Sequence, residues 1–154
     1  MVFAVVRVRG TVNIKPDIKR TLQLLQLTKI NHCVLVKENA NMKGMLQVAK
    51  DYVTWGEVDK DNLSKLIRIR GKLAGDKEIT EEYIKSATSH SSIEKLSKEI
   101  IDNKFKYKDI PDVKPIFRLN PPKRGYEGIK RSFTNKGALG YRGKEINKLI
   151  GRMI

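Results

Sequence analysis

Residues 2–9 read VFAVVRVR and are followed by Gly10. Four valines and a phenylalanine in eight positions favour a β-strand, because β-branched and aromatic side chains pack well on a pleated surface. Alternation along a strand places Arg7 and Arg9 on one face and Val6 and Val8 on the other. We therefore expect an amino-terminal strand that ends in two arginines, with the rest of the fold built outward from it.

Two helices and two more strands follow this first strand. Residues 16–25 begin with a proline at a first helical position and carry apolar residues at helical spacing. Residues 32–37 predict a second strand, Asn39 or Asn41 can cap a second helix, and residues 53–58 predict a third strand. This order predicts the α+β class, with a small ferredoxin-like split β-α-β-α-β core over residues 1–59 and both helices on one face.

Two further parts are expected after this core. Residues 60–103 predict a helical extension, in which Gly71 ends one helix, Thr80 precedes a second and Ser91 begins a third. Its section 76–103 holds seven acids against four bases, so we expect it to face solvent or protein. Residues 104–154 predict a basic segment, with a short strand near residues 116–119, that ends in an amphipathic helix.

Charge narrows the class of partner. The 154 residues carry a net charge of +15 with 40% hydrophobic residues, which allows a real core but favours a polyanionic partner. Nucleic acid is the first candidate and an anionic membrane surface the second. We expect no membrane partner, because the last helix is better explained by packing on the core. The single cysteine, Cys33, excludes an internal disulfide and fits a reducing compartment.

The main basic segment, residues 117–143, reads FRLNPPKRGYEGIKRSFTNKGALGYRG. It holds seven Lys or Arg against one acid, with five glycines and four aromatics, and it lacks the apolar runs that a core of its own needs. Lysine and arginine neutralise phosphates, glycines allow close backbone approach, and aromatic rings stack on unpaired bases. We expect it to face RNA and to be poorly ordered without it, against the alternatives of a solvated basic loop or a GxxG loop like that of KH domains. The candidate RNA-binding residues here and in the first strand and helix are Arg7, Arg9, Lys15, Arg118, Lys123, Arg124, Tyr126, Lys130, Arg131, Lys136, Tyr141, Arg142 and Lys144.

Residues for catalysis or metal binding are sparse. His32 and His90 are the only histidines and lie far apart in the sequence, while Cys33 enters an apolar strand. His32 and Cys33 are neighbours on a strand and so point to opposite faces. No phosphate-binding loop and no metal-ligand spacing is present. We expect no catalytic residue, no metal site and no cofactor.

Several stretches of the chain together resemble one known family. They are the first strand with Gly10, TLQLLQL at 21–27, VLVKEN at 34–39, YVTWG at 52–56, FRLNPPKRGYEGIKRSF at 117–133, GALGYRG at 137–143 and INKLIGRM at 146–153. They are similar to the universal large-subunit ribosomal protein called "thirty" in bacteria and "seven" in eukaryotes. The tail resembles the long archaeal and eukaryotic form, and the absence of a long basic extension before the first strand resembles the archaeal one.

This resemblance implies a structural ribosomal protein that binds large-subunit ribosomal RNA. It implies a cytoplasmic location on the ribosome, neighbouring large-subunit ribosomal proteins, a monomer within the ribosome and no enzymatic activity. It also implies that residues 118–142 include the main RNA contacts. The alternative is an RNA-binding or RNA-modifying protein that acts on structured RNA outside the ribosome.

Overall fold

The computed structural model describes residues 1–154. Its centre is a six-stranded sheet in the order β4-β2-β1-β3-β6-β5. The strands are β1 (Val2–Arg7), β2 (His32–Lys37), β3 (Val53–Glu57), β4 (Ile116–Arg118), β5 (Gly128–Ser132) and β6 (Gly137–Tyr141). The α-helices are α1 (Pro16–Leu24), α2 (Ala40–Val48), α3 (Lys60–Arg70), α4 (Glu81–Ala87), α5 (Ile93–Ile101) and α6 (Ile146–Met153). Short 3-10 helices span Ala74–Asp76, Tyr107–Asp109, Phe133–Asn135 and Gly143–Glu145.

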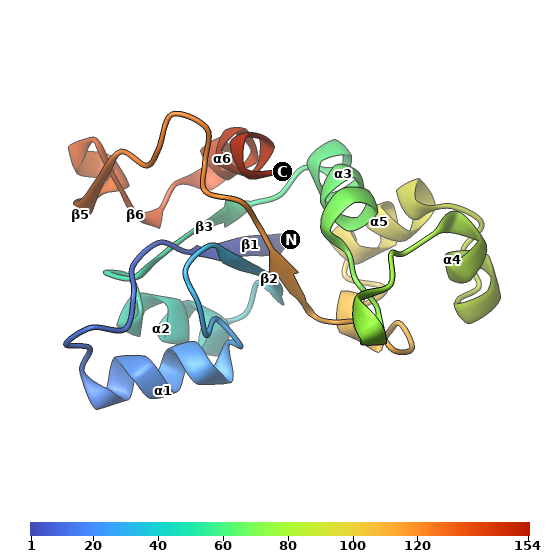
Figure 1. Ribbon diagram of the computed structural model, residues 1–154, viewed down its shortest axis with the longest axis horizontal. Coiled ribbons are helices and arrows are strands. Elements are labelled where there is room, and N and C mark those ends of the chain that lie inside the picture. The colour runs from blue at the N-terminus through green and yellow to red at the C-terminus, as the bar shows by residue number, and fades with distance from the viewer.

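Strand β1 is the central element of the fold. It pairs antiparallel with β2 on one side and with β3 on the other, and α1 and α2 cover one face of these strands (Figure 1). The predicted α+β class and the β-α-β-α-β core are therefore confirmed. All six residues of β1 are buried, because α3, α5 and α6 contribute to a second apolar cluster on the opposite face. This third layer was not predicted from the sequence.

The helix ends agree with the predicted caps in most places. The Asn39 side chain accepts a hydrogen bond from the Met42 N–H at 2.7 Å, and Thr80 accepts one from the Tyr83 N–H at 3.2 Å. Gly71 is the C-cap of α3, as predicted. The predicted cap of α5 was wrong by one residue, because Ser92 rather than Ser91 accepts from the Lys95 N–H.

Helix α6 packs against the core, as the amphipathic pattern predicted. Ile146, Leu149, Ile150 and Met153 are all buried and belong to the larger apolar cluster. A helix that covers the core in this way has no free apolar face to insert into a lipid surface. None of the helices has the length and the apolar character that crossing a membrane requires.

The acidic section forms ion pairs with lysines and arginines of the same chain. Asp76 lies 2.5 Å from the Lys114 ammonium group. Glu78 pairs with Lys72 at 3.1 Å, and Glu81 pairs with Arg68 at 3.2 Å. Glu81 therefore connects α4 to α3, and Asp76 connects the chain after α3 to the segment before β4.

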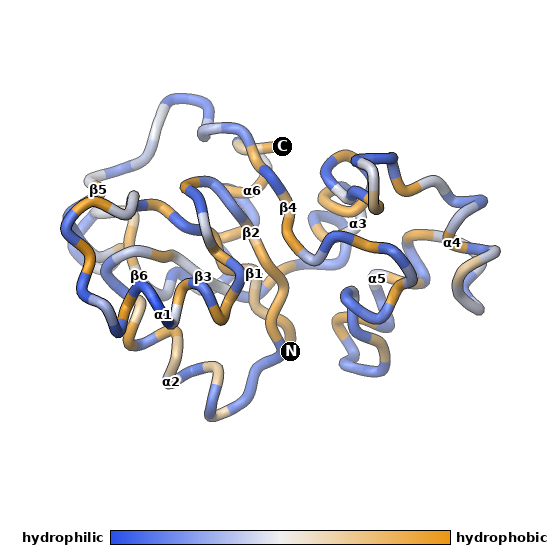
Figure 2. The backbone as a smooth tube through the Cα atoms, turned by 60° about the horizontal axis from the view of Figure 1, so that its bottom comes forward, coloured by the Kyte–Doolittle hydropathy of each residue, from blue (hydrophilic) through white to orange (hydrophobic).

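The carboxyl-terminal basic segment extends both edges of the amino-terminal sheet. Strand β4 pairs antiparallel with β2, whereas β6 pairs parallel with β3 and carries β5 beside it. The predicted short strand at 116–119 is confirmed, but β5 and β6 were not expected. The segment needs no core of its own because β2 and β3 supply open edges for pairing. Figure 2 shows hydrophobic positions along β1 and β2 and a mostly hydrophilic loop between β4 and β5.

Candidate nucleic-acid interface

Six of the exposed cations that follow β4 in the chain have no acidic partner, and we call these six the C-terminal cations. None of them forms an ion pair within the molecule. Strand β5 and helix α4 lie at opposite ends of the longest axis (Figure 1), so the cations of β5 are far from the acidic helix α4. Unpaired, exposed cations are the groups that can neutralise phosphates. The C-terminal cations are Lys123, Arg124, Lys130, Arg131, Lys136 and Lys144.

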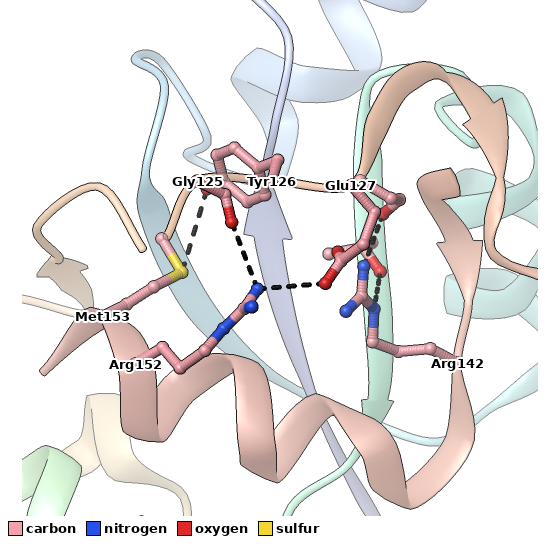
Figure 3. Close-up of polar contacts among 8 residues, drawn as sticks. Gly125, Tyr126, Glu127, Arg142, Arg152 and Met153 are labelled. Carbon is pink, nitrogen blue, oxygen red and sulfur yellow. Dashed lines mark hydrogen bonds and ion pairs between the residues drawn. The ribbon is translucent and has the colours of Figure 1, made fainter. Parts of the chain in front are cut away.

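Arg152 of α6 shapes the loop that carries the first two of these cations. Its guanidinium group donates to the Gly125 carbonyl at 3.3 Å and lies 3.2 Å from a Glu127 oxygen (Figure 3). The only acid of residues 117–143 is therefore paired with a cation from outside that segment. The sequence alone does not indicate this contact, because nothing local predicts that the loop folds back onto α6.

Tyr126 holds the same loop to the core. Its hydroxyl donates to the Asn31 side-chain oxygen at 2.6 Å and approaches the Met153 sulfur at 3.8 Å. Burial raises the pKa of Tyr126. The ring is half-buried rather than presented to solvent. Its expected role in stacking on bases is therefore replaced by a structural one.

Arg142 is a buried bridge between β6 and β3. Its Nε donates to the Thr54 hydroxyl at 2.7 Å, and its Nη2 donates to the Ala138 carbonyl at 2.8 Å. The guanidinium carbon lies 4.9 Å from the centre of the Phe133 ring. Figure 3 shows the Arg142 side chain turned toward the sheet. Burial lowers the pKa of Arg142. We therefore correct its expected role as an RNA contact, because the residue is only 6% exposed and its guanidinium group is already hydrogen-bonded.

Arg7 requires the same correction. Its Nε donates to the Arg9 carbonyl at 2.8 Å, and its Nη1 donates to the Leu27 carbonyl at 2.6 Å. Burial lowers the pKa of this guanidinium. Both faces of β1 are covered, so Arg7 is buried instead of facing a ligand. Arg9 is half-buried over the Tyr52 ring, and Lys15 is exposed just before α1.

Tyr141 and Arg118 remain accessible. Tyr141 is 51% exposed, and its hydroxyl donates to Glu57 at 2.5 Å. That hydrogen bond raises the pKa of Tyr141. Arg118 is exposed on the edge strand β4, 3.8 Å from the Asp76 carboxylate that Lys114 also contacts. Both side chains are accessible to a ligand. A ligand that binds Arg118 would compete with the Asp76 carboxylate for its guanidinium group.

Two close approaches fix the turn after β6. A Cβ added at Gly56 would lie only 1.9 Å from the Gly143 carbonyl oxygen, so the close approach of these two backbone segments requires glycine at position 56. Asn147 was missed by sequence reasoning. Its amide accepts from the Asp59 N–H and donates to the Glu57 and Lys144 carbonyls, each at 2.9 Å. The one sequence feature that could have indicated this structural role is a single asparagine on the apolar face of α6.

The glycine pairs do not form a KH-like loop. Gly137 and Gly140 lie within β6, and Gly137 is required there by packing. A Cβ at this position would meet the Arg131 carbonyl oxygen at 2.1 Å. Gly137 therefore allows the close approach of β5 to β6, which is a structural role.

The histidines and the cysteine are internal groups. His32 is buried 3.4 Å from the Thr28 hydroxyl, and burial, with the nearby Arg118, Lys29 and Arg7 charges, lowers its pKa. His90 is buried 3.4 Å from Glu99, with its ring edge-on to Phe105. Burial raises the pKa of the Cys33 thiol to about 12. No group of three His, Cys, Asp or Glu side chains is placed to hold a metal ion.

The fold and these contacts define a class, that of small basic α+β proteins whose carboxyl-terminal segment completes the sheet and presents lysines and arginines. The family described as "Ribosomal protein L30p/L7e" matches residues 3–53. The chain is 49% identical over 151 residues to "Large ribosomal subunit protein uL30" of Methanocorpusculum labreanum, covering 98% of this chain and 99% of the relative. It is 52% identical over 152 residues to the uL30 protein of Thermoplasma volcanium, covering 99% and 92%, and 46% identical over 151 residues to that of Archaeoglobus fulgidus, covering 98% and 99%. The chain therefore belongs to the uL30 family, in agreement with the resemblance found in its sequence.

Proposed function

We propose that this chain is a structural constituent of the large ribosomal subunit that binds and stabilises large-subunit ribosomal RNA without turnover. The observation that carries the proposal is the set of six exposed and unpaired C-terminal cations in a chain of net charge +15. The relatives, named as large ribosomal subunit proteins, support the same assignment. Neutralisation of crowded phosphates releases counterions, and that release drives the binding.

Three parts of the chain would share this work. Residues 1–59 supply the rigid core, residues 60–103 a helical extension, and residues 104–154 the RNA-facing part. Arg7, Tyr126 and Arg142 position the backbone rather than the RNA. The proposed RNA contacts are Arg9, Lys15, Arg118, Lys123, Arg124, Lys130, Arg131, Lys136, Tyr141 and Lys144.

The partners in this proposal are ribosomal RNA and neighbouring ribosomal proteins, with one copy of the chain per ribosome in the cytoplasm. We propose that the chain has no enzymatic activity. The alternative of an RNA-modifying protein needs a reactive group, and the two histidines are instead buried against Thr28 and against Glu99 with Phe105. The structure offers no specific observation in favour of that alternative.

The test is the salt dependence of binding to large-subunit ribosomal RNA. Each phosphate contact contributes about 0.9 to the slope of log affinity against log salt on duplex RNA. Replacing Lys123, Arg124, Lys130 and Arg131 together by glutamine should therefore reduce the slope by about 3 to 4 if all four contact phosphates. The measurement is a filter-binding or fluorescence titration at several salt concentrations.

A matched control removes the same number of charges at the other end of the molecule. Lys77, Lys85, Lys95 and Lys98 are all exposed, belong to the acidic section, and form no ion pair. Their glutamine variant should leave the slope close to that of the wild-type protein. Equal losses in the two variants would show that only net charge matters, and an unchanged slope in the first variant would place the contacts elsewhere.

A further inference from the structure

A cleft lies beside the sheet where β4 separates from β2. Strand β4 pairs with His32, Cys33 and Val34 only, so residues 35–37 of β2 continue beyond it. The cleft has a volume of about 360 Å³ and is lined by β2, the end of α1, the start of α2 and the segment that follows α5. This volume is within the range of natural binding pockets, which span roughly 300–1,000 Å³. We call it the β2 cleft.

The walls of the β2 cleft are mainly aliphatic. Ten of its seventeen lining residues are hydrophobic. Leu24, at the end of α1, is 67% exposed, and Leu35 and Val36 of β2 are only half-buried. Covering these side chains with an apolar group would remove their surface from water, which is favourable.

The aromatic residues of the cleft are already engaged with other rings. Phe105 meets His90 edge-on at 5.2 Å between ring centres, and Tyr107 stacks on Phe117 at 4.8 Å. Proteins hold unpaired bases chiefly by stacking on free aromatic faces. The aliphatic walls and the engaged Tyr107 ring favour a protein side chain over a nucleobase.

The charges that line the cleft are all of one sign. Lys37, Lys106 and Lys108 line it, and no aspartate or glutamate does. All three lysines are exposed, and none forms an ion pair within the chain. Complementary charge in an occupant would steer its approach and fix its position.

We propose that the β2 cleft binds a segment of another protein that inserts an aliphatic side chain between α1, β2 and the residues after α5, with acidic residues on either side of it. The carboxylates lie against Lys37, Lys106 and Lys108. The site is separate from the C-terminal cations, so the proposal does not depend on RNA binding by them.

The probe is an acetylated and amidated hexapeptide of sequence EDLLDE, titrated into the full-length ¹⁵N-labelled protein and followed by NMR. Saturable shift changes confined to residues 35–37 and 103–108 are the expected result. The peptide EDAADE, with the same charge, should bind at least tenfold more weakly because it lacks the aliphatic anchor. Absence of saturable binding at millimolar peptide would overturn the proposal.

Two pairs of variants test the charge and the apolar wall. Lys106→Glu and Leu24→Glu should each weaken peptide binding by about tenfold, because each places a negative charge at the cleft. The matched controls Lys104→Glu and Val48→Glu change exposed residues that do not line the cleft and should stay within twofold. The NMR spectrum of each variant reports directly whether it is folded.

A titration with RNA distinguishes a protein segment from a nucleic acid as the occupant of the β2 cleft. A uridine hexanucleotide at the same concentration should leave the shifts of residues 35–37 unchanged. Equal shifts with RNA, or equal weakening in Lys104→Glu and Lys106→Glu, would overturn the proposal in favour of nucleic acid or of general charge attraction. The Leu24→Glu protein should keep the wild-type salt slope on ribosomal RNA, so failure of one proposal does not imply failure of the other.

Discussion

Replacement of the buried Arg142 by methionine should destabilise the fold and leave RNA binding by the folded protein nearly unchanged. Methionine keeps much of the side-chain length but removes the donors to Thr54 and Ala138 and the contact with the Phe133 ring. The Thr54 hydroxyl keeps its own hydrogen bond to the Gly140 carbonyl at 2.9 Å. The Ala138 carbonyl is the group that loses its side-chain donor.

The expected magnitude follows from these contacts. A hydrogen bond that involves a charged group contributes about 1.5–3 kcal/mol, and a cation–π contact about 0.5–2 kcal/mol. Burial lowers the pKa of Arg142, which means that desolvation of the charge opposes part of this gain. We therefore expect a loss of about 3 kcal/mol in the free energy of unfolding.

Urea titration measures this loss. The fluorescence of the only tryptophan, Trp55, is a suitable signal because that residue is 8% exposed and belongs to β3 beside β6. With a urea dependence of about 2 kcal/mol per molar, the midpoint should fall by about 1.5 M. Arg20→Met, on the exposed side of α1, is the matched control and should change stability by less than about 0.5 kcal/mol.

One result would refute this reasoning. If Arg142→Met kept the wild-type midpoint but reduced the salt slope on ribosomal RNA by about 0.9, the side chain would contact a phosphate in the complex. Arg142 would then be the RNA-binding residue that its position in the basic segment first indicated. A lower midpoint with an unchanged slope supports the structural role.

Three further predictions concern the core and one ion pair. Gly56→Ala should destabilise the protein by more than about 3 kcal/mol, because backbone atoms of the turn after β6 must move to admit the new Cβ. The control is Gly44→Ala in α2, where an added Cβ would meet no atom from outside its own helix within 4 Å. This variant should not be destabilised in the same urea titration. The pKa of Asp76 is held below its ordinary value of 3.8 by the hydrogen bond to Lys114, so its contribution to stability is present above that value and is lost as the pH falls through the lower folded-state pKa. Asp76→Asn should therefore destabilise the protein near pH 5 and approach the wild type near pH 2, and a difference that grew on acidification would contradict this sign. The Cys33 thiol should resist iodoacetamide at pH 8 in the folded protein and react once urea unfolds it, whereas rapid labelling without urea would show that β2 opens readily.

The core was largely predictable because its signals are local. The β-branched run of β1, the helical spacing in α1 and the cap at Asn39 depend on neighbours within a few residues. Strands β5 and β6 were not predictable in the same way. They have weak local signals, and they pair only because β3 offers an open edge that is more than seventy positions earlier in the chain.

The candidate site was predictable as a composition but not as a set of contacts. Residues 117–143 are basic whichever way they fold, so the position of the excess charge was already evident. Whether each arginine is exposed or buried was not evident from the sequence. Arg124 is exposed and unpaired, whereas Arg142 is buried, although both belong to the same basic segment. Only long-range packing separates an arginine that can contact a phosphate from one that supports the backbone.

The sequence by itself therefore determined the α+β class, the family resemblance and the end of the chain that carries the positive charge. These features depend on residue type and short-range order. The tertiary structure alone decided that Arg7 and Arg142 are internal, that Arg152 pairs with Glu127, and that Asn147 joins α6 to the end of β3. Each of these residues makes at least one contact with a residue 20 or more positions away, and the energies of those contacts depend on burial that no local pattern encodes.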